Sequence, residues 1–279
     1  MERGSKPHYQ AEQASGQDAA LRGVIDQAVQ NLLGELQQGK SDRLLDYLAF
    51  SARFHRYSLG NQLLIYSQCP QASHVAGYKT WQALGHQVKK GAKGIRILAP
   101  RPYMKADKET SEEKQAVRFV SVAVFDASQL TDTGERPLPQ FFSPLQDDQE
   151  ELCSRLEEAM RADKIELYKS SHLGATQGYS AHGKVVTKEG LDSRSRLFVL
   201  THEYAHELLH WNGETQNVSK NVQECHAEAV SYIVAAHFGL HNPRSSDYLL
   251  NWGTTPTELM EELDVVRRTA SYIIERVNR

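Results

Sequence analysis

Two histidines and a glutamate in the C-terminal half of the chain could do metal chemistry. His202-Glu203-Tyr204-Ala205-His206 is an HExxH pattern, and the apolar residues around it predict a helix over residues 192–210. Residues four apart share one face of a helix, so both imidazoles can bind one Zn²⁺. Glu203 is then placed to act as general base on a water molecule at the metal. The pattern therefore predicts a zinc-dependent hydrolytic site.

A catalytic zinc site needs three protein ligands and one open position. His210 stands another turn along the same helix, too far for one tetrahedral metal, and the glycine of the metzincin spacing is absent. The next predicted helix, residues 221–239, carries Glu224 and Glu228 four residues apart. This fits the gluzincin arrangement, so we predict Glu224 as the ligand and Glu228 as the group that orients a ligand histidine. The reversed assignment of the two glutamates stays open.

A hairpin, one more strand and two more helices complete the predicted surroundings of the motif. The hairpin joins strands at 178–180 and 184–187, after a helix over 147–161 and a strand over 165–168, and a last helix spans 256–277. Strand 178–180 either pairs with an extended peptide substrate or is a plain edge strand. The sequence does not choose the residue that stabilises the oxyanion among Tyr179, His182, Tyr232, His237 and Tyr248.

The charge of the chain is divided between its two halves. Residues 40–105 hold eleven basic and two acidic side chains, whereas residues 147–279 hold 14 basic and 21 acidic ones. The basic part could bind a polyanion, or it could be a solvated face without a partner. Thr131 and the three prolines that follow it at positions 137, 139 and 144 mark a linker where the charge changes.

These features predict an α+β protein of two domains. The expected parts are a disordered tail at 1–19, a DNA-binding domain at 20–130, a linker at 131–146 and a mainly helical zincin-like peptidase domain with a small β-sheet at 147–279. In the first domain we predict helices over 20–36, 41–54 (capped by Ser41), 59–66 and 79–85. Strands are predicted at 95–98 and 119–125, and an exposed loop or hairpin tip at 105–115.

Aromatic residues are interleaved with the basic ones in the first domain, as single-stranded DNA would require. Phosphates need cations, and unpaired bases need flat faces on which to stack. The candidate DNA-binding residues are Arg53, Arg56, Tyr57, Asn61, Lys79, Trp81, Lys89, Lys90, Lys93, Arg96 and Arg101.

Several segments of this domain resemble the N-terminal domain of the ArdC antirestriction proteins. The matching segments are residues 61–65, 75–81, 84–91, 93–97 and 124–129. The second domain is similar to the ImmA/IrrE metallopeptidases through 202–206 and the ExxA pattern at 224–227. Two positions depart from these patterns: Ala92 replaces a common Glu, and Glu228 stands where the ImmA type usually has Asn.

The resemblance implies a single-stranded-DNA-binding domain joined to a zincin-like metallopeptidase, in a mobile-element or host-defence setting. ArdC relatives are thought to protect incoming DNA against restriction, and ImmA relatives cleave repressor proteins. The implied partners are single-stranded DNA and an unidentified protein substrate. Two alternatives stay open: a DNA-coating antirestriction protein whose zinc is structural, and an ImmA-like peptidase that cleaves a repressor.

The composition excludes several other classes of protein. Hydrophobic residues make up 40% and charged residues 24% of the 279 positions, which argues against a fibrous or mainly disordered chain. The sequence has no apolar run of about 18 residues, so we expect no membrane association. Cys69, Cys153 and Cys225 are sparse and odd in number. With a polar N-terminal stretch, they predict reduced thiols and a cytoplasmic protein.

Overall fold

The computed structural model describes residues 16–106, 113–131, 148–211, 215, 218–240 and 252–278. In these residues eight α-helices and two three-stranded sheets alternate along the chain, which confirms the predicted α+β class. Over the same residues, no helix is both long and apolar enough to cross a bilayer. The predicted linker, 131–146, falls almost wholly outside the described residues.

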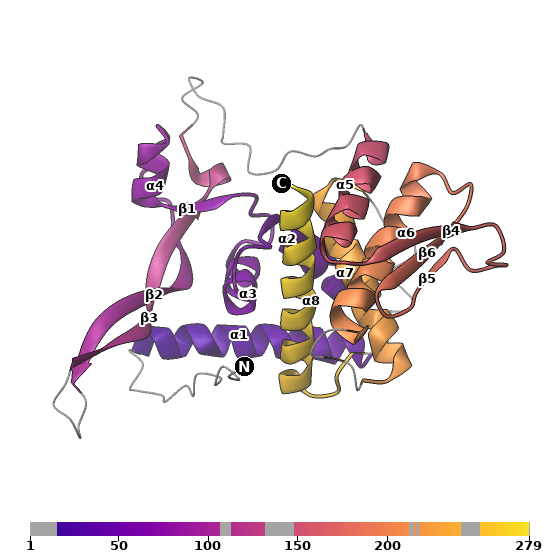
Figure 1. Ribbon diagram of the computed structural model, residues 1–279. Coiled ribbons are helices and arrows are strands. Elements are labelled where there is room, and N and C mark those ends of the chain that lie inside the picture. Colours follow the sequence, from indigo (N-terminus) through magenta and orange to yellow (C-terminus); the bar gives the residue numbers. More distant parts are fainter. Residues whose placement is uncertain are drawn as a thin grey trace.

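The described first half of the chain forms four α-helices and a twisted antiparallel sheet (Figure 1). Its elements are α1 (Gly16–Leu36), α2 (Asp42–Arg53), α3 (Leu59–Gln68), β1 (Val75–Gly77), α4 (Tyr78–Ala83), β2 (Ile95–Ala106) and β3 (Glu113–Asp126). The sheet order is β1-β3-β2. The predicted tail at 1–19 is wrong at its end, because α1 already begins at Gly16, and residues 1–15 lie outside the described part.

The β2–β3 ribbon is much longer than the sequence predicted. Its ladder runs from Ile95 opposite Val124 to Ala106 opposite Glu113, so the strand predictions at 95–98 and 119–125 were too short. The charged composition of the outer ribbon suggested a loop. The backbone ladder tolerates that composition because side chains such as Arg118 find partners on the same face, where its guanidinium lies over the Tyr103 ring.

The described second half consists of four α-helices and the other sheet. Its elements are α5 (Gln149–Ala162), β4 (Glu166–Ser170), β5 (Gly178–Ser180), β6 (Lys184–Lys188), α6 (Ser193–His206), the π-helical turn η2 (Glu207–Trp211), α7 (Lys220–His237) and α8 (Pro256–Val277). The sheet order is β4-β6-β5. β5 and β6 pair antiparallel, as predicted for this hairpin, and β4 runs parallel to β6.

Side-chain caps fix where the helices of the second half begin. Asp192 accepts a hydrogen bond from the Ser195 amide at the start of α6, as predicted, and Ser219 does the same for α7. Thr255 and Glu258 form a reciprocal capping box before α8. Ser41 stands at the N-cap position of α2, as predicted, but its side chain makes no capping hydrogen bond.

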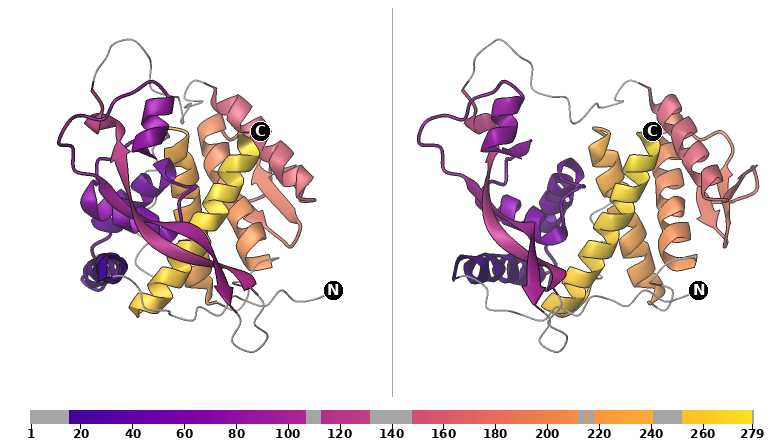
Figure 2. Two further views of the ribbon diagram at one scale, coloured as in Figure 1. Left: turned by 90° about the vertical axis from the view of Figure 1, so that its left-hand side faces the viewer. Right: turned by 60° about the vertical axis from the view of Figure 1, so that its left-hand side comes forward.

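One hydrophobic core joins the two halves of the chain. A single cluster includes Leu32 of α1, Leu48 of α2, Val230 of α7 and Ile274 of α8. Helix α8 lies between the halves, contacting α1 and α3 as well as α5 and α7 (Figures 1 and 2). The N-terminal helices therefore bury their apolar faces partly against the C-terminal ones.

Two buried histidines lie where α2 meets α7. The Nδ1 atom of His237 is 3.0 Å from the Ala52 carbonyl oxygen and donates to it in the neutral ring, while Nδ1 of His55 is 3.4 Å from the same oxygen. The two rings meet edge to face at 4.8 Å. Burial lowers the pKa of His55 and lowers the pKa of His237 to about 4, with the positive charge of Arg56 acting in the same direction. Both rings are therefore neutral in the folded protein at pH 7.

This junction should make the folded state sensitive to acid. The pKa of His237 is lower in the folded protein than in the unfolded chain. The contribution of this residue to folding stability is therefore complete above about pH 6.5 and is lost as the pH falls toward 4. The variant His237→Gln keeps a donor for Ala52 but does not titrate. When the pH is lowered from 7 to 5, we expect the free energy of unfolding to fall about 2 kcal/mol less in this variant than in the wild type. Urea unfolding at both pH values measures this difference.

The exposed His172 offers a matched control. The variant His172→Gln should keep the wild-type pH dependence. If His237→Gln keeps it too, protonation of His237 does not oppose folding.

Candidate metal centre

Two parallel rows of side chains run along α6 and η2. The sequence places His202, His206 and His210 at intervals of four, and Glu203, Glu207 and Trp211 each follow one position later. Residues four apart share a helix face, so the rows lie side by side. The histidine row faces α7, and the second row faces the β5–β6 hairpin. Helix α6 thus carries its chemistry on two adjacent faces.

A further side chain of α6 anchors the helix away from these rows. The hydroxyl of Tyr204 donates to the carboxylate of Asp163, at the end of α5, over 2.5 Å. Asp163 also accepts hydrogen bonds from Tyr272 and Arg276 of α8. Helix α6 is therefore tied to α5 and α8 by one polar network that is partly buried.

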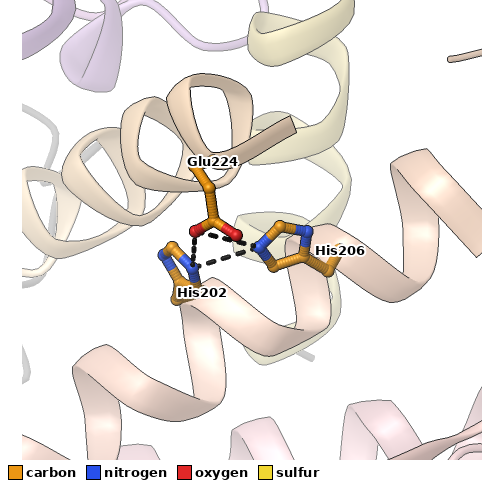
Figure 3. Close-up of side chains that lie close together, drawn as sticks. All are labelled: His202, His206 and Glu224. Carbon is orange, nitrogen blue, oxygen red and sulfur yellow. Dashed lines mark hydrogen bonds and ion pairs between the residues drawn. The ribbon is translucent and has the colours of Figure 1, made fainter. Parts of the chain in front are cut away.

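The structure brings His202, His206 and Glu224 together (Figure 3). The two Nε2 atoms of the histidines are 3.1 Å apart, and Oε2 of Glu224 lies 3.3 Å from His202 Nε2 and 3.7 Å from His206 Nε2. A tetrahedral zinc with bonds of about 2.0–2.1 Å needs ligand atoms about 3.3 Å apart. The three donor atoms therefore fit a single zinc-sized ion without rearrangement.

Glu228 occupies a different place from Glu224. Its Oε2 atom is 3.4 Å from Nδ1 of His202, on the opposite side of the ring from the ligand nitrogen. A carboxylate at Nδ1 fixes the tautomer that leaves Nε2 free to bind a metal. The geometry thus favours Glu224 as ligand and Glu228 as its support over the reversed assignment.

The charges of the cluster favour a cation at its centre. Burial alone would lower the pKa of His202, but hydrogen bonds to Glu224 and Glu228 outweigh it and raise the pKa to about 10. Hydrogen bonds from His202 and His206 lower the pKa of Glu224. Burial raises the pKa of Glu203, although the nearby histidines oppose this. Three carboxylates around two imidazoles make a site in which a divalent ion balances the charge.

A cavity of about 970 Å³ opens over this cluster. Its walls come from the segment that ends in β5, from α6 and from the inward face of α7. Of the described oxyanion candidates, Tyr179 lines the cavity, whereas His182, Tyr232 and His237 do not. His237 instead contacts α2. The fifth candidate, Tyr248, lies outside the described residues.

The spacing of His210 predicted that it is not a third ligand, and the structure agrees. Its ring centroid is 5.2 Å from that of His206, and its Nε2 atom lies 3.2 Å from the Gln223 carbonyl oxygen. Burial lowers the pKa of His210 to about 4, so the ring is neutral. It packs against His226 and helps hold α7 beside η2.

Sequence reasoning missed the contacts between the second row and the hairpin. Oε2 of Glu207 accepts the Gly183 amide at 2.6 Å, and Nε1 of Trp211 donates to Oγ of Ser180 at 3.3 Å. Ser180 and Glu203 both line the cavity. The four-residue period of the pattern could have indicated that a second face of the helix is used.

Most of the predicted DNA-binding residues are exposed, but three are held by the fold. The exposed ones are Arg53, Arg56, Lys79, Lys89, Lys90, Lys93, Arg96 and Arg101. The prediction that Trp81 stacks on a base was wrong, because its ring is fully buried and its Nε1 donates to the Phe125 carbonyl oxygen. Asn61 uses both ends of its amide on the backbone of Leu98. Tyr57 is half-buried, with its hydroxyl on the Val75 carbonyl oxygen.

Comparison with known proteins agrees with this architecture. Residues 23–126 match the family model of the N-terminal domain of anti-restriction factor ArdC. Two crystal structures of the antirestriction protein ArdC from plasmid R388 are similar in fold. The metal-free one has a TM-score of 0.56 and 15% identity over 91% of this chain and 95% of that chain. The Mn(II)-bound one has a TM-score of 0.53 and 14% identity over 91% and 97%. Residues 23–126 thus form an ArdC-type N-terminal domain, and the chain as a whole is similar in fold to ArdC.

A Bacillus anthracis protein described as uncharacterised, pXO2-81, is 26% identical over 284 residues. The match covers 85% of this chain and 48% of the relative, so the chain spans about half the length of that protein.

The close approach of β5 to α6 depends on Gly178. A Cβ atom there would collide with Val199, lie 3.0 Å from the Val186 carbonyl oxygen and reach within 3.7 Å of Glu203. We expect Gly178→Ala to push the strand from the helix and to cost about 1–3 kcal/mol of stability, as overpacking does. Thermal and urea unfolding measure the loss. The control Gly34→Ala, in open space on α1, should be neutral or slightly stabilising. Equal stabilities of the two variants would contradict the close approach.

Proposed function

We propose that this ArdC-like chain is a metal-dependent peptidase of the gluzincin type that also binds single-stranded DNA. The observation that carries the peptidase proposal is the placement of His202, His206 and Glu224 around one point, with Glu203 beside them in an open cavity. A purely structural metal site has no need of a buried carboxylate that is not a ligand.

Zinc is the metal that this ligand set suits best. Two imidazoles and one carboxylate are a common catalytic zinc combination, whereas Mn²⁺ prefers carboxylate, carbonyl and water oxygens. The R388 ArdC crystal structure described as Mn(II)-bound makes a divalent ion in this fold reasonable. When bound, such an ion would polarise a peptide carbonyl and acidify water.

The residues of this chain supply the remaining functions. Glu203 accepts a proton from the attacking water and returns it to the leaving amine. β5 is the outer strand in the order β4-β6-β5 and lines the cavity, so its backbone can align an extended peptide beside Glu203. Tyr179 projects from this strand and is the candidate donor for the developing oxyanion.

The variant Glu203→Gln tests the peptidase proposal. It keeps the size and hydrogen bonding of the side chain but cannot accept a proton. We expect zinc-dependent hydrolysis of a casein or unfolded-protein substrate to fall about 10²- to 10⁴-fold, the usual share of general acid–base catalysis. Zinc content per chain, measured by atomic emission, should stay at the wild-type level.

Replacement of a ligand provides the contrast. His202→Ala should lose both zinc and activity, because two remaining ligands leave the metal labile. If Glu203→Gln hydrolyses protein as fast as the wild type, the site is not a gluzincin centre. If Glu203→Gln loses hydrolysis as expected, protection of incoming DNA in cells that carry this variant shows whether antirestriction needs proteolysis or only DNA binding.

The basic surface of the first half supports the DNA proposal. Lys89, Lys90 and Lys93 lie exposed on the segment between α4 and β2, and Lys79 lies on α4 itself. Lys89 donates one hydrogen bond to the Ser128 carbonyl oxygen, which orients its ammonium group. Such a row of cations suits a phosphate backbone of low sequence specificity.

We expect the full chain to bind single-stranded DNA more tightly than duplex DNA, with a steep loss of affinity in salt. Lys90→Ala and Lys93→Ala should each reduce the salt slope by about one phosphate contact. Fluorescence anisotropy with a labelled oligonucleotide at several salt concentrations measures the slope. Lys169→Ala on β4 is the matched control and should leave it unchanged. Equal slopes for all three variants would place the DNA elsewhere.

A further inference from the structure

Charge is unevenly distributed along the cavity over the metal centre. The acidic residues of its wall, Glu203, Glu224 and Glu228, all lie at the centre itself. The basic residues are Arg194, in the first turn of α6, and Lys220, at the start of α7. Away from the metal centre, the carboxylate and ammonium or guanidinium groups described in the wall are therefore all cations.

Arg194 extends the face of α6 that carries the ligand histidines. Arg194, Phe198 and His202 follow one another at intervals of four, and all three line the cavity. The guanidinium carbon of Arg194 lies 5.9 Å from the centroid of the Phe198 ring, which helps to hold its side chain. Eight residues of helix span about 12 Å, so this cation lies two turns from the metal centre.

The position of Arg194 is not one that helix stability favours. The helix dipole opposes a cation in the first turn of α6. Arg196 of the same helix, in contrast, points to α5 and lies 2.8 Å from Oε1 of Glu150. The carboxylate of Asp192 accepts hydrogen bonds from the amide and the hydroxyl of Ser195. The guanidinium of Arg194 at the cavity wall is thus better explained by a bound anionic group than by folding.

The direction of β5 decides which part of a bound peptide lies beside Arg194. A Cβ atom on Gly178 would meet Val199, and Ser180 accepts its hydrogen bond from Trp211, so β5 runs in the same direction as α6. An extended peptide on the outer edge of β5 forms the more stable ladder when it runs antiparallel. Its chain then runs from Trp211 toward Arg194, and the residues on the carboxyl side of the scissile bond lie beside Arg194.

We propose that Arg194 selects peptide substrates that carry a carboxylate three or four residues past the scissile carbonyl. This inference rests on the proposed peptidase function. An extended chain advances about 3.3 Å per residue, so about 12 Å from the metal centre corresponds to that distance along the peptide. A guanidinium binds a carboxylate through two parallel hydrogen bonds. The carboxylate belongs either to an acidic side chain or to the C-terminus of the peptide.

The test begins with a mixed synthetic peptide library and the zinc-loaded full chain, with cleavage sites read by mass spectrometry. Aspartate is then moved through the first five positions after the scissile bond of a cleaved peptide, with asparagine as the uncharged reference. We expect kcat/KM to be about 5- to 10-fold higher for aspartate at the third or fourth position only, between the values of an exposed and a bidentate ion pair. Peptides that end there with a free or an amidated C-terminus distinguish the two sources of the carboxylate.

Variants of Arg194 separate recognition from structure. Arg194→Ala should remove the preference for aspartate, and Arg194→Glu should invert it in favour of lysine at the same position. Zinc content and thermal midpoint should stay at wild-type values. The control Arg161→Ala, at an exposed arginine of α5 outside the cavity wall, should keep the preference. In Glu203→Gln, which does not depend on turnover, fluorescence anisotropy should show tighter binding of the aspartate peptide by the same factor.

Three results would overturn the proposal, and they differ from one another. If the wild type cleaves no peptide of the library, the peptidase function fails and this inference falls with it. If the wild type is active but Arg194→Glu keeps the wild-type preference, only the role of Arg194 is refuted. If the preferred carboxylate lies before the scissile bond, the peptide runs in the opposite direction along β5.

Discussion

The four-residue period of α6 and η2 is the constraint on which the rest of the site depends. A helix offers several faces, and this one uses each for a different contact: the histidine row for α7, the glutamate and tryptophan row for the hairpin, and Tyr204 for Asp163. Because Asp163 also binds α8, the helix cannot turn about its axis without breaking contacts to three neighbours. The general base and the ligand histidines are therefore held in one rotational setting, which a catalytic centre requires.

The arrangement of charge follows from that setting. Carboxylates contact both ring nitrogens of His202, since Glu224 approaches its Nε2 atom and Glu228 approaches its Nδ1 atom. Burying this many carboxylates is unfavourable unless cations accompany them. In the protein alone the imidazole of His202 fills that role, as its raised pKa indicates. A divalent ion would replace the proton on His202 Nε2 and free that nitrogen for coordination.

How much of this could be read from the sequence depends on the distance over which each signal acts. The HExxH pattern, the i, i+4 pair Glu224 and Glu228, the hairpin around 181–183 and the Asp192 cap are local, and the structure places all of them where periodicity indicated. The prediction for Trp81 was wrong because the burial of its ring depends on residues far from it in the sequence or across the sheet. An aromatic residue among lysines suits base stacking, but its exposure depends on whether other side chains cover it. Val88 and Leu130 pack against Trp81, and the sequence alone does not predict that contact. The hydrogen bond from Trp211 to Ser180 could not be predicted either, because it joins a helical turn and a strand whose relative placement depends on the tertiary fold.

The charge change along the chain suggested two independent modules. The shared hydrophobic core explains why the chain cannot be divided into two fragments that each fold alone. Leu48 of α2 and Ile274 of α8 lie in one cluster, and the Ala52 carbonyl oxygen at the end of α2 binds His237 of α7. Cutting the chain near residue 140 would expose the apolar faces of α1 and α2 on one fragment and those of α7 and α8 on the other. Each exposed face carries a hydrophobic cost of about 25 cal/mol per Å² of apolar surface. Basic surface and metal centre are thus distinct in chemistry but not in folding, because the helix that supplies Glu224 and Glu228 also packs against the one that carries Arg53.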